Sequence, residues 1–220
     1  MTYLDLVKSV MVRLRENIPQ TVASTSYSKL IGELVNDAKR YCEDAWDWSA
    51  LRTTLIATTQ EDLFSYVLTG SGQRIKVLRV IDDTNNRTLQ YQTSAWMSNA
   101  YLAGTAPKAP PSYYSFNGVD SNGDTQVDLY PKPAGVYTLN FESVLRTDRW
   151  IYEDGADDAT KLTIPSDPVI QWAYAYALRE RGESGGQSAQ EQVLFAQQSL
   201  SDAIALDAQK HPEETVWTYV

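Results

Sequence analysis

A chain of 220 residues, with 43% hydrophobic and 21% charged residues, is long enough to bury a core in one large domain or two small ones. It has no apolar run of about eighteen residues, and charged residues interrupt its first segment, so we expect neither a membrane span nor a signal peptide. The formal net charge of −9 disfavours binding to phosphate backbones, and the single cysteine, Cys42, excludes an internal disulfide. These features favour a cytoplasmic origin.

The chain is expected to begin with two amphipathic helices, over 2–15 and 25–54. The second is predicted as one long helix, capped by Thr25 or Ser26, on which the rest of the protein packs. Its tryptophans Trp46 and Trp48 are expected to close the helix against apolar neighbours. The apolar residues of this helix recur at the spacing that lines one helix face: Leu30, Ile31, Leu34, Ala38, Tyr41, Cys42 and Ala45.

The middle of the chain changes to β-branched and alternating patterns, which predict strands. A helix is predicted over 94–103, and residues 82–86 form the turn of a predicted hairpin. Antiparallel pairing is the simplest arrangement of these strands. The acidic segment 148–158 is weakly patterned and is predicted to be an exposed loop. The predicted strands are 51–60, 64–68, 74–81, 87–93, 113–116, 126–130 and 136–145.

Helices return near the end of the chain. Asp167 is predicted to cap a helix with Pro168 at its first position, and a final helix is predicted over 188–210. The order of helices, then strands, then helices along the chain indicates an α+β fold. In this fold the N- and C-terminal helices form a helical bundle, and the centre forms an antiparallel sheet or sandwich. The predicted organisation is a helical domain of 1–50 and 165–212, a β-rich domain of 51–164, and a C-terminal tail, 213–220.

No catalytic or metal-binding constellation is visible. His211 is the only histidine, so neither a nucleophilic triad nor a zinc site can be assembled. The loop Asp120–Asp124 imitates the start of a calcium loop, but Thr125 replaces the required glycine and Pro131 the closing glutamate, so a turn is predicted. The segment Thr69–Gly72 is also predicted to be a turn. We therefore expect no enzyme activity, no metal and no cofactor.

The aromatic content is the remaining signal, with six tryptophans and fourteen tyrosines. Tyrosine and tryptophan are enriched in interface hot spots, and several lie in predicted loops, short elements or the terminal segment. Packing within the chain is the competing interpretation for each. The residues predicted to contact a partner are Trp96, Met97, Tyr101, Trp150, Tyr152, Trp217, Tyr219 and Val220.

Several segments in their order along the chain resemble a known family. These are DAWDWSALRTT, FSYVL, IKVLRVIDD, QVDLYPKPAGVYTLNFESV and LTIPSDPVIQWAYAYALRERG with LSDAIALDA. The chain is similar to the head-to-tail adaptors of tailed phages, and most of all to tail tubular protein A of the short-tailed phages. The resemblance covers nearly the whole chain and rests on the order of the segments.

The resemblance implies a structural virion protein, assembled in the cytoplasm of the host bacterium and located at the portal vertex. Such adaptors form a homo-oligomeric ring, commonly of twelve subunits, between the portal protein and the tail nozzle protein. DNA passes through the centre of the ring without specific binding, and no membrane is involved. By analogy, the helical part would face the portal, and the strands with residues 96–111 would face the nozzle.

Two other functions are compatible with the residues. The first is a monomeric module that binds a carbohydrate or peptide on a Tyr- and Trp-rich sheet face, where Tyr91, Tyr113 and Tyr130 would lie together. The second is an acid/base hydrolase that uses the loop around Asp154 and Asp157, and it is the weaker alternative because nothing apolar nearby would shift the pKa values of these carboxylates.

Overall fold

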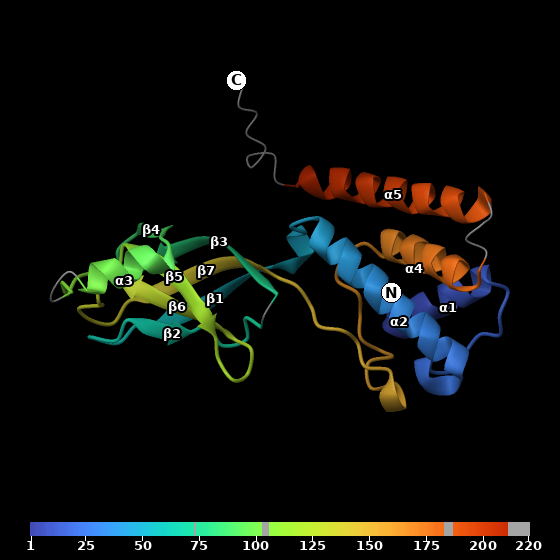
Figure 1. Ribbon diagram of the computed structural model, residues 1–220, viewed down its shortest axis with the longest axis horizontal. Coiled ribbons are helices and arrows are strands. Elements are labelled where there is room, and N and C mark those ends of the chain that lie inside the picture. Colours follow the sequence, from blue (N-terminus) through green and yellow to red (C-terminus); the bar gives the residue numbers. More distant parts are fainter. Residues whose placement is uncertain (73, 103–105, 183–186, 211–220) are drawn as a thin grey trace, which may run out of the picture. The chain divides into compact units, whose positions relative to one another are not determined.

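The computed structural model describes residues 1–72, 74–102, 106–182 and 187–210 (Figure 1). Within these residues the chain forms five α-helices and one seven-stranded β-sheet, which confirms the predicted α+β class. The chain divides into two compact units, Met1–Leu51 with Asp148–Val220, and Arg52–Thr147. The helices of the first unit are α1 (Tyr3–Arg13), α2 (Ser26–Ala45), α4 (Ser166–Glu180) and α5 (Gln187–Ala208).

Helices α1 and α2 begin where the sequence supplies capping boxes. The Thr2 hydroxyl accepts the Asp5 N–H at 3.2 Å, and the Asp5 carboxylate accepts the Thr2 N–H at 3.0 Å. At α2, the Thr25 hydroxyl accepts the Ser28 N–H at 2.9 Å, and the Ser28 hydroxyl accepts the Thr25 N–H at 2.9 Å. Both pairs satisfy N–H groups that a helix start leaves free, so the predicted cap at Thr25 is confirmed.

The predicted helix over 25–54 is too long, because α2 ends at Ala45. Trp46 already has extended backbone angles, φ −150° and ψ 155°. Trp48 is only 1% exposed, and its indole N–H donates to the carbonyl oxygen of Cys42 at 2.7 Å. The indole thereby satisfies one of the carbonyls that a helix end leaves without an intrahelical partner. A short 3-10 turn then leads into the first strand.

The buried face of α2 is more polar than its apolar pattern indicated. Tyr41 and Ala45, which belong to the predicted stripe, are exposed. Asn36, Lys39 and Glu43 are at most 2% exposed. A periodicity of apolar residues could not reveal these three, because their side chains are stabilised by hydrogen bonds and ion pairs and not by hydropathy.

Gly32 is the point at which α2 comes closest to its neighbours. A Cβ atom at this position would lie 2.5 Å from the Tyr3 hydroxyl oxygen and 2.7 Å from a Val22 methyl carbon, and both side chains are fully buried. Alanine usually stabilises a helix relative to glycine, by about 1 kcal/mol. Here we expect Gly32→Ala to lower the free energy of unfolding by about 1–3 kcal/mol, measured by urea denaturation, because the core would be overpacked.

Gly135 provides the matched control for this prediction. A Cβ atom at Gly135 would meet no heavy atom within 4 Å. The change Gly135→Ala is therefore expected to alter the free energy of unfolding by less than about 0.5 kcal/mol. A Gly32→Ala variant as stable as the Gly135→Ala variant would contradict the close approach of Tyr3 and Val22 to α2.

The segment 148–164 lies in the helical unit, although the sequence placed it in the β-rich domain as an exposed loop over 148–158. Trp150 is 7% exposed, and its ring centroid lies 4.9 Å from that of Tyr3. The Asp158 carboxylate accepts the backbone N–H of Val22 at 3.2 Å. The acidic composition was misleading because carboxylates of this segment accept backbone N–H groups and do not all face solvent.

Helix α4 contacts α1, α2 and α5. It begins at Ser166, and Pro165 occupies the cap position without a side-chain hydrogen bond. The predicted cap at Asp167 is therefore wrong. Asp167 instead lies in the first turn, where a negative charge interacts favourably with the helix dipole.

The second unit is a curled sheet with α3 (Ser94–Leu102) beside it. The strand order is β1-β7-β3-β4-β5-β6-β2, and the core contains, among others, Val80, Leu89, Leu129 and Phe141. The predicted hairpin of β3 and β4 is confirmed, with Val80 opposite Leu89. The strands are β1 (Arg52–Thr58), β2 (Ser65–Val67), β3 (Ile75–Asp82), β4 (Arg87–Tyr91), β5 (Tyr113–Val119), β6 (Thr125–Tyr130) and β7 (Thr138–Leu145).

The sheet is mixed and not wholly antiparallel, which corrects the simplest expectation. Strands β4 and β5 run parallel, with Gln90 opposite Tyr113 and Tyr91 opposite Tyr114. Parallel neighbours require a crossover of about a dozen residues or more, and here α3 and the segment after it supply the connection. The helix predicted over 94–103 is therefore part of the crossover between β4 and β5.

Candidate functional site

The described residues contain no group of three or more His, Cys, Asp or Glu side chains able to hold a metal ion. Burial raises the pKa of Cys42 to about 12, so its thiol stays protonated near neutral pH and is a poor nucleophile. Among the described helices, none combines the length and the apolar content that a membrane crossing requires.

The turn that imitates a calcium loop uses its carboxylates to hold the backbone. Asp120 accepts the N–H groups of Asn122 and Asp124, both at 2.8 Å. The Asp124 carboxylate accepts the N–H groups of Gly72 at 3.0 Å and Gly70 at 3.1 Å, and these bonds lower its pKa. The two segments therefore form turns, as predicted, and their acidic groups serve the fold.

Three of the predicted interface residues lie together on α3. The Trp96 ring is 5.0 Å from that of Tyr113 and 5.5 Å from that of Tyr130, and 36% of Trp96 is exposed. Met97 is 2% exposed, and the Tyr101 hydroxyl donates to a carbonyl oxygen of β6. These side chains pack on the sheet, and Trp96 keeps the most exposed surface of the three. Their contact with a partner stays a prediction.

The tyrosines considered for a sugar-binding face do not share one face of the sheet. Tyr113 and Tyr130 lie opposite each other on β5 and β6, under the Trp96 ring. Tyr91 lies opposite Tyr114, and successive residues of a strand point to opposite faces. Tyr91 is therefore separated from Tyr113 by the thickness of the sheet, and these three residues form no continuous platform.

The other predicted contact residues lie in the helical unit or outside the described residues. The Lys39 ammonium lies 4.4 Å from the Trp150 ring centroid, so this buried tryptophan already has its contacts within the chain. Tyr152 is partly buried, and the Lys29 ammonium lies 5.9 Å from its ring. Outside the described residues lie Trp217, Tyr219, Val220 and the predicted tail, 213–220.

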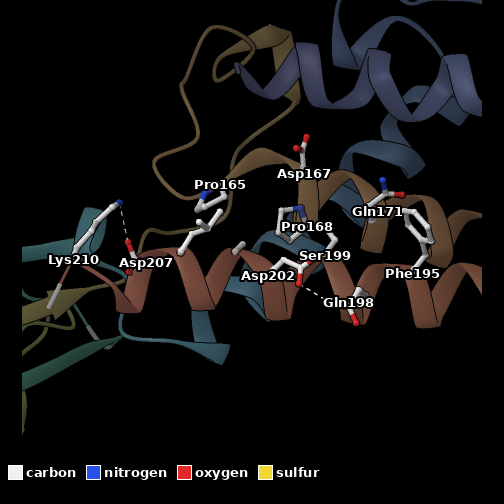
Figure 2. Close-up of a pocket in the computed structure, with 12 residues that line it drawn as sticks. Pro165, Asp167, Pro168, Gln171, Phe195, Gln198, Ser199, Asp202, Asp207 and Lys210 are labelled. Carbon is white, nitrogen blue, oxygen red and sulfur yellow. Dashed lines mark hydrogen bonds and ion pairs between the residues drawn. The ribbon is translucent and has the colours of Figure 1, made fainter. Parts of the chain in front are cut away.

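A groove of about 610 Å³ lies along α4 and α5 (Figure 2). Helix α4 and the residue before it contribute two prolines and two polar residues. Successive turns of α5 contribute side chains spaced three and four residues apart, which places them on one face of the helix. The lining residues are Pro165, Asp167, Pro168 and Gln171, with Phe195, Gln198, Ser199, Asp202, Ala203, Leu206, Asp207 and Lys210.

Two large apolar side chains on α5 stay open to solvent in this groove. Phe195 is 64% exposed and Leu206 is 66% exposed. They are eleven positions apart, or about 16 Å along the helix, with Ala203 between them. Apolar side chains gathered on one helix face and exposed in this way are typical of a surface that another segment covers.

The walls of the groove offer hydrogen-bond acceptors. Asp167 and Asp202 are exposed at its edge, and Gln198 donates to Asp202 at 2.7 Å. Gln192 donates to Gln171 at 2.9 Å, which holds α5 against α4. Near one end, Lys210 forms an ion pair with Asp207 at 3.0 Å. The groove therefore suits an apolar occupant that carries hydrogen-bond donors.

Asp207 fixes the end of α5 to the segment that follows α2. Its carboxylate accepts the Ser49 N–H at 2.9 Å, the Ser49 hydroxyl, the Trp46 indole N–H at 3.2 Å and the Lys210 ammonium at 3.0 Å. Burial alone would raise the pKa of Asp207, but the hydrogen bonds from Ser49 and Lys210 outweigh it and lower the pKa. The charged carboxylate thereby holds the groove's end in place.

This lowered pKa predicts a pH dependence of stability. A carboxyl group with a depressed folded-state pKa stabilises the protein above its unfolded pKa, about 3.9, and loses that effect as the pH falls through the folded value. We expect Asp207→Asn to cost about 1–3 kcal/mol at pH 7, in urea denaturation, and to cost less near pH 3. A cost that did not shrink at the lower pH would contradict the charged state of Asp207.

The opposite flank of α5 has a second, smaller hollow of about 430 Å³. Leu194 is 64% exposed there, and Ala175, Ala189 and Val193 contribute the apolar lining, with Arg179 at the edge. The two flanks of α5 therefore present different apolar surfaces, one around Leu194 and one around Phe195.

Neither flank of α5 was predicted from the sequence, although three consecutive residues of the helix indicate them. A helix that packs on one neighbour needs a single apolar stripe, whereas α5 has three consecutive large apolar residues, Val193, Leu194 and Phe195. Three consecutive positions cover about 200° of the helix, which is more than the contact with α4 can bury. The surplus indicates a surface for a second contact.

The comparison with protein families agrees with the resemblance noted from the sequence. Residues 1–216 match the family model described as SU10 adaptor protein. No curated protein matches the chain. Since the match spans nearly every residue of both units, the chain belongs to the SU10 adaptor protein family, and its kinship with phage head-to-tail adaptors is confirmed.

Proposed function

We propose that the protein is a structural component of a phage virion, which forms a ring between the portal protein and the tail nozzle protein. The family match over residues 1–216 carries this proposal. The ring would contain twelve copies, assembled in the host cytoplasm and seated at the portal vertex. The exposed apolar flank of α5 around Leu194 supports a contact with another virion protein, because apolar surface left open in this way is typical of a contact site.

The charge of the chain supports a passive role toward DNA. A net charge of −9 opposes strong contacts with phosphates, so DNA would pass through the centre of the ring without specific binding. In this arrangement the terminal helices would form a bundle that makes the ring body and contacts the portal. The strands and residues 96–111 would face the nozzle, with Trp96 among the contact residues.

Binding to the portal tests the proposal. Native mass measurement of the purified chain, mixed with the portal protein of its own phage, is expected to show about twelve copies per portal ring. Persistent absence of a complex at micromolar concentrations would overturn it.

Two exposed leucines test the orientation of the ring. Leu194 is 64% exposed on α5, and Leu102 is 82% exposed on α3. We expect Leu194→Asp to weaken portal binding and to spare nozzle binding, and Leu102→Asp to do the reverse. Both changes add one charge at an exposed position, so each is the matched control for the other. The opposite pattern would reverse the proposed orientation.

A further inference from the structure

The groove around Phe195 and Leu206 begins where the described chain ends. Lys210, the last described residue, is itself one of the residues that line the groove. The next ten residues, 211–220, read HPEETVWTYV, and each of the last six is β-branched or aromatic and has an uncharged side chain. The apolar groove therefore ends at Lys210, and the apolar segment 215–220 follows this residue closely in the sequence.

The lengths of the two features agree. From Phe195 to Lys210 the helix axis spans about 22 Å, at 1.5 Å per residue. Seven extended residues, from Lys210 to Trp217, span about 23–25 Å. Because the reversal of direction uses some of these residues, Trp217 would lie beyond Leu206, and Tyr219 and Val220 would continue toward Phe195.

The chemistry of the two features is complementary as well. In an extended segment Trp217 and Tyr219 point to the same side, so both rings could face the groove together. The indole N–H and the phenol O–H are donors, and Asp167, Asp202 and Gln198 supply acceptors along the groove. Glu213 and Glu214 carry the only charged side chains of residues 211–220 at pH 7 and would stay near the exposed Lys210 ammonium.

We propose that residues 215–220 fold back on the same chain and occupy the groove between α4 and α5, covering Phe195 and Leu206. A segment tethered beside its site has an effective concentration in the millimolar range. Even a dissociation constant of about 0.1 mM would then keep the groove occupied about nine-tenths of the time. The flank around Leu194 stays open, so this contact is separate from the proposed contact with the portal.

Hydroxyl-radical footprinting of the chain without its portal tests this inference. The oxidation rates of Phe195 and Leu206 would be compared between the full chain and a chain that ends at Lys210. We expect both rates to be about tenfold lower in the full chain, as nine-tenths occupancy requires. Leu194, 64% exposed on the other flank, is the internal control, and its rate is expected to be equal in the two proteins.

A second variant separates loss of docking from loss of folding. The full-length Trp217→Ala/Tyr219→Ala variant is expected to oxidise at Phe195 and Leu206 as fast as the shortened chain, with unchanged helical circular dichroism. Equal rates in the full and shortened chains would overturn the inference. Protection that disappears on hundredfold dilution would also overturn it, because the occupant would then come from a second copy.

Discussion

Replacing Lys39 by methionine is expected to lower the free energy of unfolding by about 3–5 kcal/mol in urea denaturation. Lys39 is 2% exposed, and its ammonium lies 3.8 Å from the carboxylate of Glu43, which is fully buried. The same ammonium donates to the carbonyl oxygen of Asp148 and lies 4.4 Å from the ring centroid of Trp150. Methionine would preserve the volume but would remove the cation from a buried carboxylate.

The partner of this ion pair supplies the control. Removing one member of a buried pair is strongly destabilising, whereas replacing both members by apolar residues is often close to neutral. The double variant Lys39→Met/Glu43→Leu is therefore expected to recover more than half of the stability that Lys39→Met loses. A single variant within about 1 kcal/mol of the natural protein would show that the pair is not buried as described.

The second large effect is expected at Asn36, which connects α2 to the segment 148–164. Its side-chain amide donates to the carbonyl oxygen of Trp150 at 3.0 Å, and its side-chain oxygen accepts the Trp150 N–H at 3.0 Å. Asn36→Ala would leave two backbone groups without these partners, at about 1–3 kcal/mol each. The free energy of unfolding is therefore expected to fall by about 2–6 kcal/mol in urea denaturation.

Arg40 is the matched control on the same helix. Its side chain is 59% exposed, and its ion pair with Asp44 spans 4.0 Å. An exposed pair of this kind contributes little, so Arg40→Ala is expected to change the free energy of unfolding by less than about 1 kcal/mol. If Asn36→Ala were no more costly than Arg40→Ala, the attachment of Trp150 to α2 would be refuted.

These two positions also show where prediction from the sequence stops. The periodicity of the chain predicted the helices and strands, because local spacing reports which side of an element is buried. It did not reveal Asn36, Lys39 or Glu43, whose burial depends on partners that hydropathy does not register. The periodicity also predicted that α2 continues beyond Ala45. It could not show that the Trp48 indole donates a hydrogen bond to the Cys42 carbonyl oxygen at the helix end.

The candidate surfaces were predicted only in part. The aromatic content predicted that both Trp96 and Trp150 contact a partner. Trp96 is partly exposed, whereas Trp150 is buried against Tyr3 and Lys39. Composition alone cannot distinguish the two cases, because an aromatic ring suits a core as well as an interface. Which residues of α5 are exposed depends on how much of α5 is covered by α4. Only the packing of the two helices shows this coverage.

The order of segments along the chain was more informative about function than any single residue. No motif for catalysis or for a metal is involved, and the resemblance depends on pieces such as the Trp-rich end of α2 and the helix after Ile164. Each piece alone is compatible with ordinary core or turn structure. Their succession over both units is what the family match over residues 1–216 bears out.

Electron microscopy of the chain bound to the portal of its own phage tests the central proposal most directly. The predicted result is a single ring of twelve copies stacked on the portal, with an open central channel wide enough for duplex DNA. A portal that stays bare, or a chain that binds as isolated copies without closing a ring, would contradict the proposal that this protein is the connector between head and tail.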